Sequence, residues 1–182
     1  MMKKRIVVTG LGVVSSIGIG KDAFWNNLTK GISGISEITS YDTSKHVTHR
    51  GGEIKDFNPE NFINKRKIQF IGRTSQFAIV AAKLAIADAN LKINKFKPSV
   101  AIGTTMGEAR RLEKIDRLWI DTGDASINKE LFFQYLTNAV SANLAIELKA
   151  SGPNRIFGTA CAAGNYAIGY GYDTIRRGAA DV

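Results

Sequence analysis

Short apolar runs that end in small residues alternate with segments of helical periodicity along the whole chain. Three of these runs are rich in β-branched or aromatic residues, as is typical of strands buried on both faces. They are residues 5–9 (RIVVT), 99–105 (SVAIGTT) and 155–159 (RIFGT). Because helical patterns follow each run, the order strand, helix, strand, helix, strand, helix predicts an α/β fold in which helices cover a mixed sheet.

The helical segments differ in how their apolar residues are arranged. In residues 73–91, alanine surrounds the apolar positions, which predicts a helix buried on most sides. Residues 107–120 predict an amphipathic helix with Leu112, Ile115 and Trp119 directed inward. The other helices are expected over residues 21–29, 129–148 and 161–177, and a long excursion of little regular structure is expected over residues 31–60.

Length and composition indicate a globular intracellular protein. The chain has 182 residues, of which 44% are hydrophobic, so it can bury a core. Charges interrupt every apolar stretch before the ~20 residues of a membrane helix, and the apolar run after the basic start is too short for an export signal. One cysteine forms no internal disulfide, which suits a reducing compartment. We expect a cytoplasmic protein.

The net charge of +9 favours an acidic partner. The positive residues fall in short groups that share no RNA-binding sheet motif, zinc-finger spacing or aromatic stacking series, so nothing beyond charge supports nucleic acid. These groups are Lys3, Lys4 and Arg5; Lys65, Arg66 and Lys67; Arg110, Arg111, Lys114 and Arg117; and Arg176 and Arg177.

The single cysteine, Cys161, lies where a predicted strand turns into a predicted helix, in the small-residue segment GTACAAGNYAIG (residues 158–169). A helix N-terminus favours a thiolate, and its unpaired backbone N–H groups can hold the oxygen of a tetrahedral acyl intermediate. Small neighbours leave room for a thioester and a second substrate. The segment therefore indicates an acyl-transfer nucleophile, and the alternative is a buried cysteine that acts as a small hydrophobic residue.

Simpler site templates do not fit. The hydrolase elbow needs glycine where Thr159 and Ala163 stand. A dinucleotide-binding loop would place its third glycine at Ser15. His46 and His49 have no cysteine near them that could complete a set of metal ligands. We therefore expect both histidines to lie on the surface, and we expect no metal site.

Three glycines interrupt the last predicted helix. Gly164, Gly169 and Gly171 each cost about 1 kcal/mol relative to alanine in a helix interior. Close packing against neighbouring backbone is the usual compensation, and we expect it here. Gly178 is expected to end the helix.

An ordered series of segments closely resembles the N-terminal half of β-ketoacyl-[acyl-carrier-protein] synthases of the elongating type II class, which have a thiolase-like layered fold. The resemblance covers nearly all of the chain. The segments are RIVVTGLGVVSSIG, GISGIS, YDTS, DFNPENF, RTSQFAIVAAKLAIADANL, VAIGTTMG and GTACAAGNYAIG.

The resemblance implies a reaction centred on Cys161. In the family, the matching cysteine accepts an acyl chain from an acyl carrier protein as a thioester. Malonyl carrier protein then loses CO2, and the resulting carbanion attacks the thioester to give a β-ketoacyl product two carbons longer. No metal or organic cofactor is implied.

The resemblance also suggests roles for other residues. Met106 matches a position that lines the acyl pocket, and Phe133 falls in a segment that approaches the partner's pocket in family dimers, so both are expected to bind the acyl chain. Lys65, Arg66 and Lys67 fall where relatives present basic residues to the acidic carrier protein. A homodimer, or a heterodimer with another synthase subunit, is therefore expected.

The chain also departs from the family pattern. The two histidines and the lysine that assist decarboxylation belong to the C-terminal half of the family, so residues 1–182 are expected to be an N-terminal half that is a fragment or is completed by another chain. Gly72 stands where many relatives carry aspartate. Two alternatives are a non-catalytic partner subunit that sets chain length, which Cys161 disfavours, and a thiolase-like transferase that uses acyl-CoA.

Overall fold

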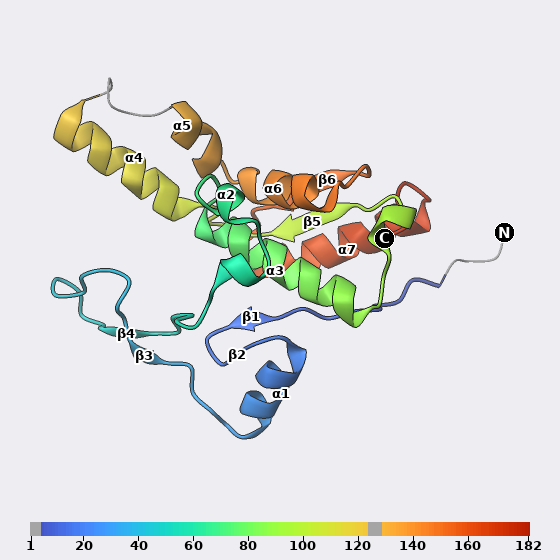
Figure 1. Cartoon of the computed structure of the whole chain (residues 1–182), viewed down its shortest axis with the longest axis horizontal. Helices are drawn as coiled ribbons and strands as arrows, with labels where there is room; N and C mark the ends of the chain where they lie inside the picture. The colour runs from blue at the N-terminus through green and yellow to red at the C-terminus, as the bar shows by residue number, and fades with distance from the viewer. Residues whose placement is uncertain (1–4, 124–128) are drawn as a thin grey trace.

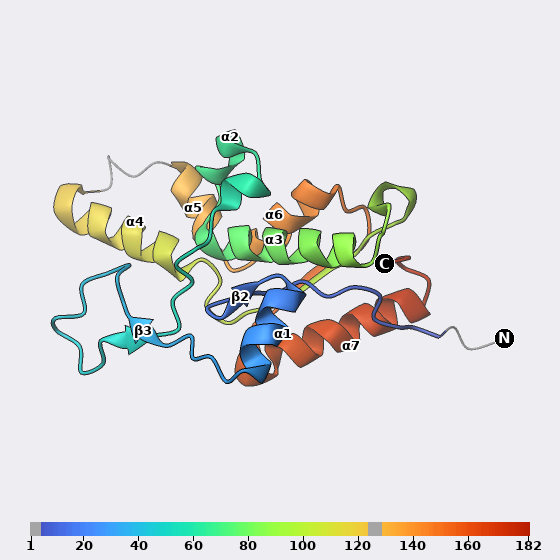
Figure 2. The ribbon, with the colours of Figure 1, turned by 60° about the horizontal axis from the view of Figure 1, so that its bottom comes forward.

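A pair of parallel strands lies at the centre of the computed structural model, which describes residues 5–123 and 129–182. Strand β5 (Val100–Gly103) runs beside β6 (Asn154–Phe157) in continuous register. Helix α7 (Ala163–Arg176) covers one face of the pair. Helix α6 (Ala139–Leu148) covers the other face, with α3 (Arg73–Asp88) packed beside α6 (Figures 1 and 2). The layered α/β arrangement predicted from the sequence is therefore confirmed.

One buried cluster holds the layer of α3 and α6 against the strand pair. Ile79 and Val80, in the middle of α3, are almost completely buried. Burying a side chain of this size contributes about 1.5–3 kcal/mol. The cluster comprises Phe57, Ile63, Ile79, Val80, Val100 and Leu144.

Most helices lie where the apolar spacing places them. Helix α1 (Lys21–Thr29) has the predicted bounds, and Gly178, at φ 73°, follows the end of α7 as predicted. The single helix expected over residues 129–148 is wrong, because α5 (Lys129–Tyr135) and α6 are separate helices. Thr137 and Asn138 are poor helix formers in the gap between them, and the loop at Gly107 lies against Thr137.

The buried strand predicted over residues 5–9 is also wrong. The segment belongs to no strand, and Val7 and Val8 are 64% and 78% exposed. A strand needs hydrogen-bonded neighbours, and the described residues give this segment none. The chain is instead attached to α3 just afterwards, where the Leu11 N–H donates to Asp88 at 2.9 Å.

Two glycines after this segment allow the chain to lie directly on α3. A Cβ atom at Gly10 would lie 2.1 Å from the carbonyl oxygen of Ala85, and one at Gly12 would lie 1.8 Å from that of Ala81. Both distances are far shorter than a van der Waals contact. The GLG sequence is therefore explained by helix packing.

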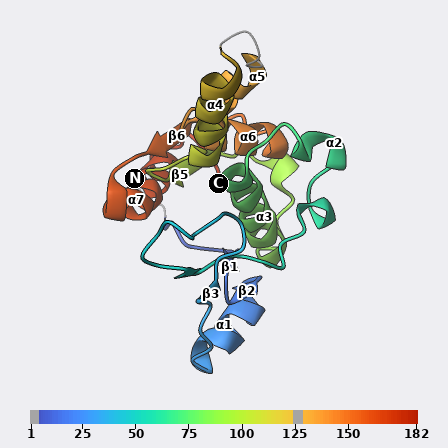
Figure 3. The same ribbon diagram turned by 90° about the vertical axis from the view of Figure 1, so that its left-hand side faces the viewer.

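Helix α4 (Ala109–Thr122) is less buried than predicted. Ile115 is buried, but Leu112 and Trp119 are 42% and 59% exposed, so the inward face of three residues is wrong for two of them. The reason is that α4 packs mainly along α5, and the two helices project together from one end of the molecule (Figure 3). The rest of the apolar side of α4 has no covering element among the described residues.

Residues 31–60 form the predicted excursion of little regular structure. They contain only the two-residue strands β3 (Ser36–Glu37) and β4 (Arg50–Gly51) and the start of the 3-10 turn η1 (Pro59–Asn61). His46 and His49 are exposed there, as predicted. The other short elements are β1 (Val14–Ser15), β2 (Gly18–Ile19), α2 (Lys65–Ile68) and η2 (Ile93–Lys95).

No helix in the described ranges is long and apolar enough to cross a membrane. Lys3 and Lys4, of the first basic group, lie outside the described residues.

We predict that Gly12→Ala destabilises the 182-residue chain by about 2–3 kcal/mol, because the added methyl group forces the N-terminal segment away from α3. Urea denaturation measures this loss. Gly171→Ala is the matched control, since a Cβ atom there meets no atom within 4 Å. The control should be neutral or stabilise by up to about 1 kcal/mol, and equal effects of the two changes would contradict the packing described.

Candidate functional site

The carboxyl ends of β5 and β6 open at the same edge of the strand pair, because the strands are parallel. The Thr104 N–H donates to the carbonyl of Phe157 at 3.0 Å and joins the two strands at this edge. A Cβ atom at Gly103 would lie 2.3 Å from the backbone carbonyl of Ala163, so the end of β5 touches the start of α7 directly. Ligands of open α/β sheets bind at such edges.

Cys161 lies at this edge, in the single 3-10 turn η4 (Ala160–Ala162) between β6 and α7. The predicted position at a strand-to-helix junction is therefore confirmed. The thiol is exposed, so the alternative of a buried hydrophobic cysteine does not describe it. A reagent can reach the sulfur from solvent.

The backbone around Cys161 is strained and has a free donor. Ala160 has φ 48°, in the left-handed region that costs a residue with a Cβ atom about 1–2 kcal/mol. The Ala162 N–H donates to the carbonyl of Thr159 at 3.1 Å. The Cys161 N–H has no acceptor among the described residues. This N–H can therefore donate to an oxygen that forms on an acyl group bound to the sulfur.

The helix face that continues from Cys161 is open. A Cβ atom at Gly164, Gly169 or Gly171 would meet no atom within 4 Å, so the close packing expected for these glycines is wrong for the described chain. Tyr166 and Ile168 are exposed on the same helix. No described residue lies against the three glycine positions, whereas the Tyr166 ring stacks on Phe157 of β6.

Of the two residues expected to bind an acyl chain, one shares the edge with Cys161. Met106 lies in the loop that leaves β5, and its side chain is 72% exposed. Phe133 lies on α5, which packs on α4 and α6, and it is also largely exposed. The described chain does not place Phe133 at the strand edge.

A buried carboxylate that sequence analysis missed holds the Met106 loop. Glu108 is 2% exposed, and its carboxylate accepts from the Ser75 N–H at 2.7 Å, the Ser75 hydroxyl at 2.6 Å and the Thr74 N–H at 3.3 Å. The Thr74 hydroxyl donates to the carbonyl of Gly107 at 2.8 Å. The first turn of α3 therefore binds the loop beside the candidate site.

The same contact explains the unusual glycine at position 72. Gly72 is the N-cap residue of α3, where an aspartate side chain would accept from the first backbone N–H groups. Here Glu108 supplies the carboxylate from another segment. A Cβ atom at Gly72 would lie 1.9 Å from a carboxylate oxygen of Glu108, so there is room for one of the two acids only. Gly72 was the one feature of the sequence that could have indicated a carboxylate supplied from another segment.

The three basic residues expected to dock a carrier protein are the first three residues of α2, and all are exposed. Lys65 pairs with Glu60 at 3.5 Å, and Lys67 pairs with Glu147 at 2.8 Å. Arg66 has no ion-pair partner among the described residues. Its charge is therefore the one most available to a partner.

Glu147 fixes α2 to the body of the molecule. Its carboxylate, on α6, also accepts from Lys83 of α3 at 2.5 Å. Burial opposes the charge, yet hydrogen bonds from Lys67 and Lys83 hold the pKa of Glu147 below its usual range. The carboxylate thus stays charged at neutral pH and connects α2, α3 and α6.

No group of three or more histidine, cysteine, aspartate or glutamate side chains in the described ranges is placed to hold a metal ion. The chemistry that this edge offers is that of an accessible thiol beside a free backbone donor.

Comparison with known proteins connects this geometry to one family. The sequence model described as β-ketoacyl synthase, N-terminal domain, matches residues 3–182. A 3-oxoacyl-[acyl-carrier-protein] synthase 2 of Staphylococcus aureus strain COL is 36% identical over 181 residues, which are 98% of this chain and 44% of that protein. The synthase of the same name from Synechocystis sp. is 37% identical over 179 residues, which are 97% of this chain and 43% of that protein.

A solved structure described as the ishigamide ketosynthase/chain length factor superposes with a TM-score of 0.85 at 34% identity. The match covers 94% of this chain and 44% of that one. The chain therefore spans less than half the length of the relatives that it matches.

We predict that positions 72 and 108 are coupled. Gly72→Asp alone should cost about 2 kcal/mol or more, because its side chain collides with Glu108. Glu108→Ala alone should cost about 1–3 kcal/mol, because Thr74 and Ser75 lose their acceptor. The double variant should recover most of the loss, since the introduced aspartate then caps α3.

The coupling is measured by urea denaturation in a double-mutant cycle. Glu113→Ala, which removes an exposed acid from α4, the helix that Glu108 precedes, is the control partner for Gly72→Asp. Strictly additive losses at positions 72 and 108 would show that the two carboxylates do not occupy the same place.

Proposed function

Because the chain belongs to the β-ketoacyl synthase family, we propose that it is the N-terminal half of a 3-oxoacyl-[acyl-carrier-protein] synthase in which Cys161 carries the growing acyl chain. The observation that carries the proposal is the exposed Cys161 thiol at the β6–α7 junction, beside its own unpaired N–H group. The activity would serve fatty acid or polyketide-like synthesis.

The reaction uses Cys161 twice. In the first step the Cys161 thiolate attacks the carbonyl carbon of an acyl thioester on the carrier protein, and the carrier thiol leaves. In the second step malonyl carrier protein loses CO2, and the carbanion attacks the acyl-Cys161 carbonyl and releases the thiolate. The Cys161 N–H donates to the oxyanion in both steps, and one such donor is typically worth ~10²–10³ in rate.

Decarboxylation needs groups beyond this chain's described residues. We propose that the two histidines and the lysine of the family come from a C-terminal half, in the same or another chain. The uncovered glycine positions of α7 and the exposed Val7 and Val8 support this proposal, because no described element covers either surface. Residues 1–182 are accordingly proposed as the N-terminal half of one ketosynthase domain.

The partner proposed for α2 is the acidic acyl carrier protein. Arg66 has no competing ion pair among the described residues, and the Glu147 contacts hold the helix in place. The proposed assembly is a dimer, in which Phe133 on the projecting α5 reaches the partner's acyl pocket. Met106 is proposed to line the pocket of its own chain. The reaction is assigned to the cytoplasm, where a free thiol stays reduced.

Acylation of Cys161 tests the proposed function directly. We predict that the intact protein, incubated with acyl carrier protein loaded with a fatty acyl chain, gains one acyl group on the peptide that contains Cys161, as read by mass spectrometry. Cys161→Ala should gain none and should lose at least about a thousandfold in condensation rate, since the covalent route is removed.

The same acylation and condensation assays separate the proposed synthase from a CoA-dependent transferase and from a non-catalytic subunit. Equal acylation by acyl-CoA and acyl carrier protein would favour a CoA-dependent transferase. Condensation that persists in Cys161→Ala when a second synthase is added would identify a non-catalytic partner subunit. Either result would contradict the proposal.

We predict that Arg66→Glu raises the KM for the carrier protein about tenfold and leaves kcat nearly unchanged, because it reverses an unpaired charge on the docking helix. Lys95→Glu makes the same charge change at an exposed residue of η2 and should have little effect. The difference should shrink at high salt. A similar rise in KM for both variants would place carrier docking elsewhere.

A further inference from the structure

A hollow separate from the Cys161 edge is lined by basic side chains. It has a volume of about 590 Å³ and lies between the 31–60 excursion and the first turns of α3 and α4. Two guanidinium groups, from Arg73 and Arg110, share its wall with Lys55, Glu53, Ile54 and Phe77. The sequence placed Arg110 in a basic group but gave no indication of this site.

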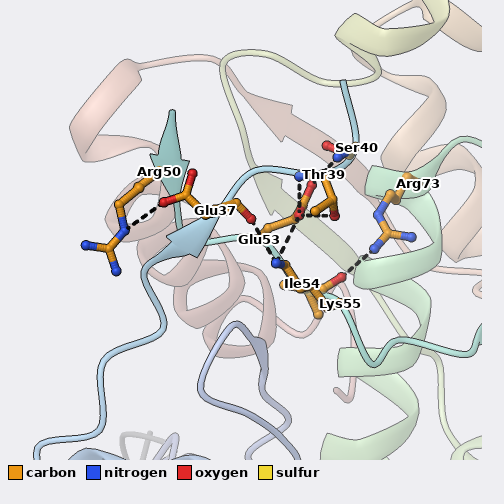
Figure 4. Close-up of polar contacts among 8 residues, drawn as sticks. All are labelled: Glu37, Thr39, Ser40, Arg50, Glu53, Ile54, Lys55 and Arg73. Atoms are coloured by element: carbon orange, nitrogen blue, oxygen red, sulfur yellow. Dashed lines mark hydrogen bonds and ion pairs between the residues drawn. The ribbon is translucent and has the colours of Figure 1, made fainter. Parts of the chain in front are cut away.

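The Arg73 side chain is fixed in place. Its guanidinium group lies 5.4 Å from the ring centre of Phe57 and 4.8 Å from that of Phe77. One nitrogen donates to the carbonyl of Ile54 at 2.7 Å (Figure 4). A guanidinium has five N–H donors, and this is the only acceptor that the described residues give it.

The second guanidinium adds to an uncompensated charge. Arg110 donates to the carbonyl of Ser40 at 3.2 Å, and among the described residues neither arginine has an ion pair. Burial, and then the charge of Arg110, lower the pKa of Arg73. Two like charges therefore line the same hollow.

The one carboxylate of the wall is already occupied. Glu53 accepts from the Thr39 N–H at 3.0 Å, the Thr39 hydroxyl at 2.9 Å and the Ser40 N–H at 2.8 Å (Figure 4). Hydrogen bonds from Ser40 and Thr39 lower the pKa of Glu53 to about 2, so it stays ionised. Lys55 lies 4.0 Å from this carboxylate and compensates its charge. The two positive charges of Arg73 and Arg110 therefore remain uncompensated in the wall of the hollow.

We propose that this hollow binds a small phosphate monoester, with its phosphoryl group between Arg73 and Arg110. A guanidinium matches the oxygens of a phosphoryl group in two parallel hydrogen bonds, and a dianion compensates both excess charges where a carboxylate compensates one. The hollow is larger than a phosphate ion, and Phe77 and Ile54 offer apolar surface to the organic part of the ligand.

Calorimetric titration of the intact protein at fixed ionic strength tests the proposal, with glycerol 3-phosphate, inorganic phosphate and acetate as probes. Glycerol 3-phosphate should bind saturably and more tightly than phosphate, and acetate should bind least. Arg110→Gln should weaken glycerol 3-phosphate binding at least about tenfold, because a charged hydrogen-bond partner is lost. Arg117→Gln, the same change on the same helix at a residue paired with Glu113, should leave binding unchanged.

Three results would overturn the assignment. The first is that no saturable heat is measured up to about 10 mM glycerol 3-phosphate, which corresponds to a negligible affinity. The second is that phosphate and its ester bind equally well. The third is that Arg110→Gln and Arg117→Gln lose the same amount of binding. Arg110 is used because loss of the stacked Arg73 also disturbs Phe57 of the core. The hollow does not include Cys161, so this titration and the acylation of Cys161 test two separate proposals. Failure of one leaves the other standing.

Discussion

The direct backbone contact between the end of β5 and the start of α7 determines the position of everything at the candidate site. Gly103 has no side chain, so the carbonyl of Ala163 can lie only 2.3 Å from the place that a Cβ atom would take. This contact and the Thr104–Phe157 hydrogen bond set η4 across the edge of the strand pair. The Cys161 thiol is consequently exposed beside a free N–H group, in a turn whose strain is held by the surrounding packing.

A second constraint acts on the neighbouring loop. The buried carboxylate of Glu108 joins the start of α4 to the N-terminus of α3, and it does so because Gly72 leaves space for it. The Glu108 carboxylate thus satisfies N–H groups of the first turn of α3 that would otherwise be unpaired. The loop with Met106 is thereby attached to α3, whose Ile79 and Val80 belong to the buried cluster.

Local patterns predicted β5, β6, α1, α3 and the junction at Cys161, because each depends on residues close in the sequence. Features that depend on distant contacts were missed or wrong. Residues 5–9 have the composition of a strand but no neighbouring strand, and the glycines of α7 have no packed neighbour, among the described residues. The Glu108 cap and the hollow at Arg73 join segments far apart in the sequence, and no spacing rule indicates them.

A crystal structure of the intact protein acylated at Cys161 is the most direct test of the account. The carbonyl oxygen of the thioester should lie roughly 3 Å from the Cys161 N–H, and the acyl chain should pass along the strand edge beside Met106. An oxygen that points away from this N–H, or an acyl chain on the opposite face of the β5–β6 pair, would contradict the role assigned to this junction.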